Sequence, residues 1–407
     1  MPSIEKTVPN IFPAISGLLK STESRKFTRQ TNIMKSALTL LTTFFSLLAA
    51  AQEHYLIIGT YDSPKSEGIY VYKFSSTDGS ATQVSHIKTS NPSYLAVSPD
   101  QRFVYAVNEN ADSTGRGGGV SSFSFNKKNG TLSFLSSQSS EGNHPCYVTV
   151  DKTGKWVIAG NYSSGNFSVL PVSKSGILSK AKQVVQHSGS GPDSSRQRSP
   201  HVHAVYLRNG ISELFVPDLG IDKIMTYRFD SKTGHVTPTK MKFAEAPPGT
   251  GPRHIDFHPN GKFAYVMQEL NASVTVFRNL GGGYLAEMQS LSALPPYYRG
   301  PMSGADIHVS PDGKFLYCSN RDNANDIAIF SIDQATGKIA LLANVPVLGS
   351  KPRHFNFDPT GRFLLVGNQN TDEVVIFKRD IQTGMLTDSG NRISIGKPVC
   401  FKWISMK

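Results

Sequence analysis

The sequence predicts an all-β fold, a seven-bladed β-propeller, on three observations. A cassette of an apolar strand, a tight turn and a second apolar strand recurs about every 50 residues, as in GPRHIDFHPNGKFAYVMQE at 251–269. Repeats of this length built from short strands are typical of propeller blades. Half-cassettes at the two ends of the chain complete one more blade.

Each cassette is expected to form the two inner strands of a blade. The six cassettes lie at 91–109, 144–162, 200–218, 251–269, 304–321 and 351–369. A run of alternating apolar residues follows each cassette, for example ASVTVFRN after the fourth, and is expected to form the third strand. Segments entered through a glycine turn, such as GTLSFLSS, are expected to form the fourth.

The two chain ends are expected to share a blade. Residues 397–405 match the first half of a cassette, and residues 54–61 match the second half. One blade built from both ends closes the ring at seven blades and removes the exposed sheet edges that an open array would leave.

The N-terminal segment 1–51 is predicted to be an extension with a signal peptide, and 52–407 the propeller. Lys35 precedes an apolar stretch, 37–51, that ends in three alanines. This order is typical of a signal peptide near 34–51, and the stretch is short for a membrane span. We therefore expect an exported protein, periplasmic or secreted, with no membrane attachment after cleavage.

Composition narrows the expected partners. The net charge is +12, yet no Lys/Arg run suggests a nucleic-acid site, so a moderately basic surface or a channel that attracts an anion is favoured. Cys146, Cys318 and Cys400 show no zinc spacing; buried free thiols are the first interpretation and one disulfide the alternative. A closed ring needs no partner to complete its core, so a monomer is expected.

Aligning the cassettes on their turns predicts which side chains converge. The residues seven before the turn are Tyr94, Tyr147, His203, His254, Asp306 and His354, with Cys400 in the closing blade. Those one position earlier are Ser93, Cys146, Val202, Arg253, Ala305 and Arg353. Those eight after the turn are Glu109, Tyr162, Glu269, Arg321 and Gln369, with Tyr61 in the closing blade and Asp218 or Leu219 in the fourth.

These residues are expected to surround one mouth of the channel, because a hairpin starts and ends on the same side. His, Arg, Glu and Tyr bind anions and move protons. Each residue also has a purely structural interpretation, since a histidine often bonds a backbone carbonyl and Glu269 could simply pair with Arg253 or Arg321. The polar segment 186–201 is expected to be a long loop over one face.

Few signals point to a cofactor. Asp306, Asp218, Glu109 and Glu269 could together hold a calcium ion, but they come from different blades and arginines lie nearby, so no metal is expected. The chain has no G-x-S-x-G elbow, no G-x-G-x-x-G and no phosphate-binding loop.

The chain resembles the seven-bladed propeller lactonase family, which includes 6-phosphogluconolactonases and a carboxy-muconate cyclase. Segments that carry the resemblance are SPHVHAV, GPRH and the glutamate after YVMQ, within a match from about Tyr55 to Ile404. By motif, the residues thought to act in the cyclase branch correspond to His203, Arg253, Glu269 and Arg321. The resemblance implies a small anionic or sugar-lactone substrate and no organic cofactor.

Three hypotheses follow. The first is lactone hydrolysis: His203 is the general base, Glu269 orients it or exchanges a proton, and Arg253 and Arg321 hold an anion. Further substrate-binding residues would be His201, His254, Arg353, His354, Asp306, Tyr147 and Glu109. The second is a cyclase reaction on a dicarboxylate by the same residues. The third is a non-catalytic periplasmic propeller that binds a protein or a glycan.

Overall fold

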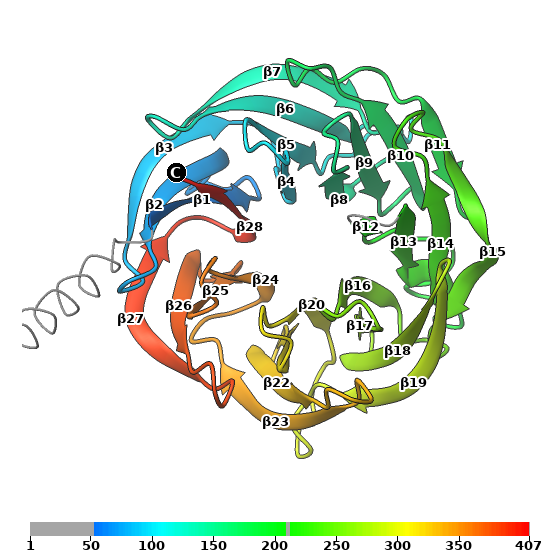
Figure 1. Cartoon of the computed structure of the whole chain (residues 1–407), viewed down its shortest axis with the longest axis vertical. Helices are drawn as coiled ribbons and strands as arrows, with labels where there is room; N and C mark the ends of the chain where they lie inside the picture. The colour runs from blue at the N-terminus through cyan, green and yellow to red at the C-terminus, as the bar shows by residue number, and fades with distance from the viewer. Residues whose placement is uncertain (1–52, 209–211, 407) are drawn as a thin grey trace, which may run out of the picture. The chain divides into compact units, whose positions relative to one another are not determined.

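A computed structural model describes residues 53–208 and 212–406, which form a ring of seven four-stranded antiparallel sheets (Figure 1). Within this part of the chain the only helix is a single 3₁₀ turn, η1 (Leu219–Ile221). The prediction of an all-β propeller with seven blades is confirmed.

We number the blades from the one that contains β1. Blade 1 holds β28 (Pro398–Ser405), β1 (Glu53–Thr60), β2 (Gly68–Ser75) and β3 (Ala81–Lys88). Blades 2 and 3 hold β4 (Leu95–Val97), β5 (Phe103–Asn108), β6 (Gly119–Asn126), β7 (Thr131–Ser139), β8 (Pro145–Val150), β9 (Trp156–Asn161), β10 (Asn166–Pro171) and β11 (Gln183–Gln186). Blades 4 and 5 hold β12 (Tyr206–Arg208), β13 (Glu213–Asp218), β14 (Lys223–Phe229), β15 (Val236–Glu245), β16 (Pro252–Phe257), β17 (Phe263–Gln268), β18 (Ser273–Gly281) and β19 (Tyr284–Ser292). Blades 6 and 7 hold β20 (Gly304–Val309), β21 (Phe315–Asn320), β22 (Asp326–Ile332), β23 (Ile339–Pro346), β24 (Pro352–Phe357), β25 (Phe363–Asn368), β26 (Glu373–Arg379) and β27 (Leu386–Ser394).

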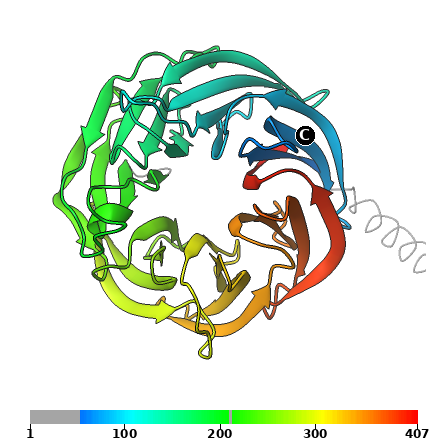
Figure 2. The same ribbon diagram turned by 180° about the vertical axis from the view of Figure 1, so that it is seen from behind.

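The ring closes in blade 1 as predicted. The C-terminal strand β28 pairs antiparallel with β1, and Ile58 lies opposite Phe401. Seen from behind, the red C-terminal strand β28 is the innermost strand of the first blade, on the channel side of the blue N-terminal strands (Figure 2). Both residues are fully buried and pack with apolar residues of blade 7, so closure fills a core as well as an edge.

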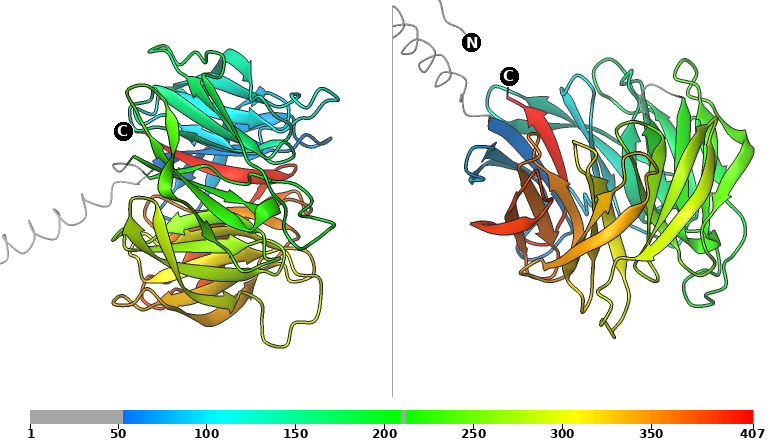
Figure 3. Two further views of the ribbon diagram at one scale, coloured as in Figure 1. Left: turned by 90° about the vertical axis from the view of Figure 1, so that its right-hand side faces the viewer. Right: turned by 60° about the horizontal axis from the view of Figure 1, so that its bottom comes forward.

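The core lies between neighbouring blades. Side views show each blade as a twisted sheet whose face packs against the next (Figure 3). The central strands β9, β17, β21 and β25 are buried along their whole length. A strand covered on both faces needs a continuous run of apolar and aromatic residues, which is what each cassette provides.

The turn of each cassette has a local cause. In blade 7 the buried Asp358 accepts a hydrogen bond from the Phe363 backbone N–H at 2.8 Å. Gly361 has φ of 69°, a left-handed conformation that glycine adopts without a Cβ clash. The aspartate and glycine of the motif therefore fix the hairpin that aligns the two inner strands.

Three further predictions concern the N-terminal segment, membrane attachment and the cysteines. The predicted extension and signal peptide at 1–51 fall outside the described residues. No helix in the described part of the chain has the length and apolar character needed to cross a membrane. Cys146, Cys318 and Cys400 are buried free thiols, so the first interpretation of the cysteines is confirmed.

Candidate active site

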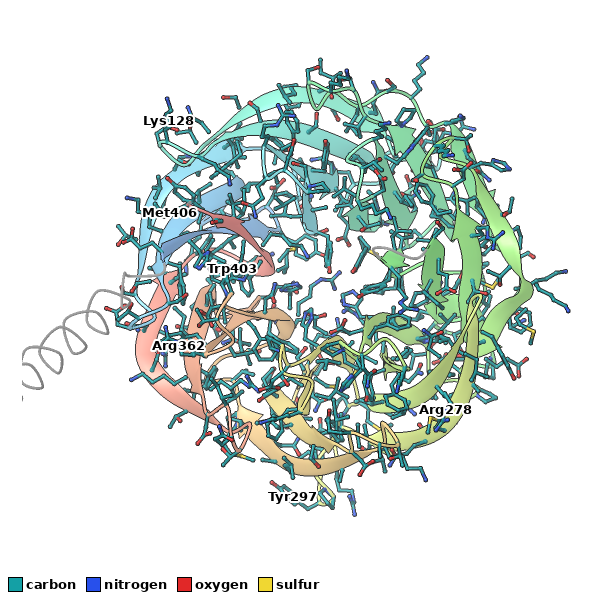
Figure 4. All side chains as sticks on the ribbon, viewed as in Figure 1. Lys128, Arg278, Tyr297, Arg362, Trp403 and Met406 are labelled. Carbon is teal, nitrogen blue, oxygen red and sulfur yellow. The ribbon has the colours of Figure 1, made fainter. Side chains whose placement is uncertain are left out.

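Irregular starts of the innermost strands turn selected side chains toward the channel. The pairing register shifts between Pro252 and His254 in blade 5 and between Pro352 and His354 in blade 7. The residues between them, Arg253 and Arg353, occupy the extra position of these bulges. Bulges commonly redirect a side chain beside an active site. Figure 4 shows side chains of the inner strands extending into the central space of the ring.

Glu269 is the centre of a buried charge cluster. Its Oε2 accepts a hydrogen bond from Arg253 Nε at 2.9 Å and lies 3.1 Å from an Arg321 terminal nitrogen. Its Oε1 accepts a hydrogen bond from Arg196 at 2.6 Å. Three guanidinium groups therefore surround one carboxylate, and the excess positive charge suits a negatively charged substrate or transition state.

Backbone carbonyls fix the two arginines that come from inner strands. Arg253 donates to the carbonyl of Ala305 at 2.7 Å, and Arg321 donates to the carbonyl of Gly304 at 3.0 Å. Arg321 Nε is buried and has no hydrogen-bond partner among residues 53–208 and 212–406. One terminal nitrogen of the guanidinium is held by the Gly304 carbonyl and by Glu269, while this buried donor is left without an acceptor in that part of the chain.

Arg196 comes from the loop between β11 and β12, the long loop that the sequence predicted. Its guanidinium also donates to the hydroxyl of Tyr162 at 3.1 Å. The next residue, Gln197, is fully buried and donates to Asp222 Oδ1 at 2.7 Å and to the Leu219 carbonyl at 2.8 Å. Gln197 thus anchors the loop and places Arg196 over the cluster.

His203 completes the cluster. Its Nε2 lies 3.7 Å from Glu269 Oε2, and its Nδ1 lies 3.7 Å from the Cys146 sulfur. The Tyr162 ring meets His203 edge-on and stacks on His201 with ring centroids 4.5 Å apart. His201 therefore reaches the cluster through Tyr162, and its Nδ1 lies 2.9 Å from the Tyr162 carbonyl oxygen.

The protonation states follow from burial and the three arginines. Burial, and then the charge of Arg253, hold the pKa of His203 well below its usual value, so the imidazole is neutral. Burial alone would raise the pKa of Glu269, but Arg321 and Arg253 hold it well below its usual value. Burial and the charges of Arg353 and Arg321 lower the pKa of Arg253 to about 10, which still leaves it charged at neutral pH.

A depression of about 450 Å³ opens beside this cluster. Arg321 belongs both to the charge cluster around Glu269 and to the lining of the depression. The other residues that line the depression are Tyr61, Asp62, Asn91, Glu109, His144, Lys351, Arg353, Gln369 and Lys397. Tyr61 donates to Glu109 at 2.8 Å, and an Arg353 nitrogen lies 3.9 Å from the same carboxylate oxygen. The predicted residues Glu109 and Arg353 thus lie together in the lining of the depression.

The remaining predicted residues form a second layer, one position further along the inner strands. His254 Nδ1 lies 2.7 Å from Asp306 Oδ1, and His354 Nε2 lies 3.6 Å from Asp306 Oδ2. Tyr147 stacks on Tyr94 at 4.0 Å and meets His254 edge-on. The prediction of a single ring of residues is therefore corrected to two layers, because adjacent strand positions cannot reach the same depth.

A divalent cation could be held in the second layer. Ligand atoms of Asp306, His308 and His354 lie within 4.8 Å of one another. Two imidazoles and one carboxylate are a common donor set for transition metals. The four carboxylates that the sequence offered as a possible calcium site, those of Asp306, Asp218, Glu109 and Glu269, are not the group that comes together; Asp306 lies with His308 and His354. Asp306 instead accepts a hydrogen bond from the Phe355 backbone N–H and pairs at hydrogen-bond distance with His254 and His308, while His354 Nε2 lies 3.6 Å away.

The structure corrects the register of the fourth blade. In blade 4 the Leu219 N–H donates to the His201 carbonyl, and Val202 pairs with Asp218. The corresponding contacts in blade 5 are the Glu269 N–H to the Gly251 carbonyl and the pair of Pro252 with Gln268. His203 is therefore equivalent to Arg253, and Leu219 to Glu269. The sequence alignment, based on the turn, placed His203 beside His254, one position too far along.

Sequence reasoning missed two contributors. Arg196 lies in a loop without strand periodicity, and its only signal is the RQR segment inside a Gly/Ser/Pro-rich stretch. His308 lies two positions beyond the aligned set, yet its Nε2 is 3.1 Å from Asp306 Oδ2. Both require the folded arrangement before their role can be seen.

Comparison with known proteins agrees with the propeller fold and identifies the family. A family described as "Lactonase, 7-bladed beta-propeller" matches residues 55–403. A 6-phosphogluconolactonase of Bacillus subtilis (strain 168) is 37% identical over 350 residues, which cover 85% of this chain and 97% of the relative.

Two solved structures are also similar. A putative 6-phosphogluconolactonase from Bacteroides fragilis NCTC 9343 has a TM-score of 0.82 at 37% identity, covering 88% of this chain and 99% of that one. A periplasmic gluconolactonase of Pseudomonas aeruginosa has a TM-score of 0.82 at 36% identity, covering 87% of this chain and 100% of that one.

Proposed function

The chain belongs to the seven-bladed β-propeller lactonase family, and we propose that it is a carboxylic ester hydrolase that opens a sugar lactone at the Glu269 cluster. The observation that carries the proposal is the buried carboxylate held by three guanidinium groups beside a neutral histidine. Such a cluster offers positive charge to an oxyanion and a base to water in one place.

His203 is the proton acceptor in this proposal. A water molecule attacks the ester carbonyl carbon and gives its proton to the imidazole. The bond from the carbonyl carbon to the ring oxygen then breaks, and the imidazolium returns the proton to that oxygen. The product is an open-chain hydroxy acid. The low pKa of His203 keeps it neutral, and therefore able to accept the proton, across the neutral range.

Arg321 and Arg253 stabilise the oxyanion that forms during the attack. Arg321 has a buried Nε donor without a partner in the described part of the chain. Glu269 stays ionised between the arginines, so its role is to position them and His203 and not to exchange a proton. The structure therefore favours the orienting role among the two that the sequence left open.

The finer assignments are the phosphorylated substrate and the exported location. The relative from Bacillus subtilis carries the name 6-phosphogluconolactonase, and a neighbour from Pseudomonas aeruginosa is a periplasmic gluconolactonase. We propose that this chain accepts a gluconolactone, including its 6-phospho form, and that the 1–51 segment directs its export. Tyr147, His254, Asp306 and His354 would form the floor below the substrate.

The test is a pH-indicator assay of the protein from Gln52 onward, with glucono-δ-lactone and its 6-phospho form. We expect turnover of at least one lactone, and a fall of about 10² or more in kcat for His203→Ala, the usual contribution of a general base. Because no metal is needed, EDTA should leave the rate unchanged. The same rate in His203→Ala, with the fold intact, would reject the base assignment. Silence on both lactones would favour the cyclase or binding hypotheses.

A further inference from the structure

Four residues in an unusual backbone conformation converge on the depression beside the active site. Asn91, His144, Lys351 and Lys397 have φ between 41° and 62°, the left-handed region. Each directly precedes the proline before or at the start of an inner strand, and all four line the depression. They come from consecutive blades around one side of the ring.

The backbone at this position does not require a side chain. Gly251 occupies it in blade 5, with its N–H bonded to Asp222 Oδ1 and its carbonyl bonded to the Glu269 N–H. Lys351 repeats the arrangement, with its N–H bonded to Asn325 Oδ1 and its carbonyl bonded to the Gln369 N–H.

Lys397 makes the equivalent bonds in blade 1: its N–H donates to Asp372 Oδ1, and its carbonyl accepts from the Tyr61 N–H. Glycine therefore satisfies the same bonds without the steric cost of a Cβ at positive φ. Two lysines at positions where glycine is the cheaper residue indicate a use for their side chains, since strained non-glycine residues of this kind cluster at ligand sites.

The charges around the depression suit an anion. Its lining has four cationic side chains, those of Arg321, Lys351, Arg353 and Lys397, and two carboxylates. Of the carboxylates, Glu109 accepts from Tyr61, and Asp62 accepts from the Asn91 N–H. Among residues 53–208 and 212–406, no carboxylate lies within 4.0 Å of the Lys351 or Lys397 ammonium.

We infer that this depression is the subsite for a phosphate group carried by the lactone substrate, with Lys351 and Lys397 as its specificity-determining residues. The inference rests on the proposed function, because Arg321 joins the depression to the Glu269 cluster. A phosphate dianion offers several acceptor oxygens, and cations from two blades can each bind one. The subsite would select phosphorylated over unphosphorylated lactones.

A purely structural interpretation makes a different prediction. If the lysines only end a turn, replacing them with glycine should relieve the backbone cost and change nothing else. Lys242 offers a matched control, because it has φ of 61° and is exposed on the outermost strand β15, away from the channel.

The experiment compares Lys351→Gly, Lys397→Gly and the double variant with Lys242→Gly, measuring kcat/KM for glucono-δ-lactone and for its 6-phospho form. We expect kcat/KM of the double variant to fall at least about tenfold for the phosphorylated lactone and much less for the unphosphorylated one. A fall of about tenfold corresponds to the loss of one charge-assisted hydrogen bond. The melting temperature should not fall, and Lys242→Gly should keep the wild-type preference. An unchanged preference in the double variant, or a wild-type enzyme with no preference for the phosphorylated lactone, would overturn the inference.

A binding measurement separates this inference from the proposed reaction. If the wild type turns over neither lactone, the reaction assignment fails, and titration with inorganic phosphate still tests the subsite. Binding by the wild type and by Lys242→Gly, lost in the double variant, would support the inference. Equal binding by all variants, no binding by the wild type, or equal competition by acetate would overturn it; the last outcome would assign the depression to a carboxylate.

Discussion

At the scale of single residues, the site depends on the balance of charge at Glu269. Its carboxylate contacts three arginines. The side chain is only 7% exposed, so solvent contributes little to stabilising its charge. A buried charge that loses its counter-charge has no solvent to compensate it. The fold and the chemistry therefore depend on the same side chain.

Glu269→Gln keeps the size of the side chain but removes its charge. We expect a loss of about 3 kcal/mol in the free energy of unfolding, because Arg253 and Arg321 remain buried without a counter-charge. Urea unfolding of both proteins measures it. In the double variant Glu269→Gln with Arg253→Met the loss should be smaller than the sum of the two single losses. Additive losses would show that the pair is not coupled.

At the scale of elements, the loop between β11 and β12 brings to the site a charge that no strand supplies. Its position is fixed at its first residue and near its middle. His187 Nδ1 lies 2.7 Å from Asp218 Oδ2, and Gln197 bonds Asp222. The loop is therefore held by buried polar contacts, although its composition is that of a surface segment.

Arg196→Ala tests the role of this loop. The Arg196 side chain is 42% exposed, so its loss should change stability little, while the KM for an anionic lactone should rise about tenfold as one binding cation is removed. The matched control is Arg198→Ala, two residues along the same loop, where the exposed side chain donates to the Ser194 carbonyl. If both variants show the same KM, Arg196 does not act on the substrate.

At the scale of the whole molecule, the channel concentrates histidines that the fold keeps neutral. Burial, followed by the charge of Arg253, lowers the pKa of His254 from 6.5 to about 4. Burial likewise holds the pKa values of His203 and His354 well below 6.5. His308 is the opposite case, because Asp306 outweighs burial and raises its pKa.

Stability should therefore fall as the pH drops from 6.5 toward 4. In this window the unfolded chain binds protons that His203, His254 and His354 cannot accept in the fold, so acid favours unfolding. His254 alone accounts for at most about 3 kcal/mol near pH 4, because its shift spans 6.5 to about 4. His308 opposes the trend, since its contribution is fully present below 6.5 and is lost as the pH rises through its folded pKa.

Urea midpoints at pH 7.5, 6.0 and 4.5 measure this dependence, and His254→Gln should flatten it. The exposed His235→Gln serves as the control. Glu269 and Asp306 should add a further loss at still lower pH, as each is protonated through its lowered folded pKa. A midpoint that stays constant or rises between pH 6.0 and 4.5 would contradict the prediction.

The architecture was predictable because the same local sequence pattern recurs in each blade. Each cassette carries its own strands and its own turn, and the two half-cassettes state where the ring closes. Arg253, Glu269 and Arg321 were identified from the same repeat, since a closed ring must bring equivalent positions together. These inferences required only strand alternation and symmetry.

The tertiary structure decided what the repeat leaves open. His203 joins Arg253 and not His254, because hydrogen-bond register in the fourth blade overrides the spacing to the turn. Arg196 reaches Glu269 because a buried glutamine anchors an irregular loop. The sequence by itself determined the ring and the ring positions of most site residues, since these follow from periodicity. Depth in the channel, charge state and loop contacts depend on burial and distance between distant segments, and only the folded chain defines these.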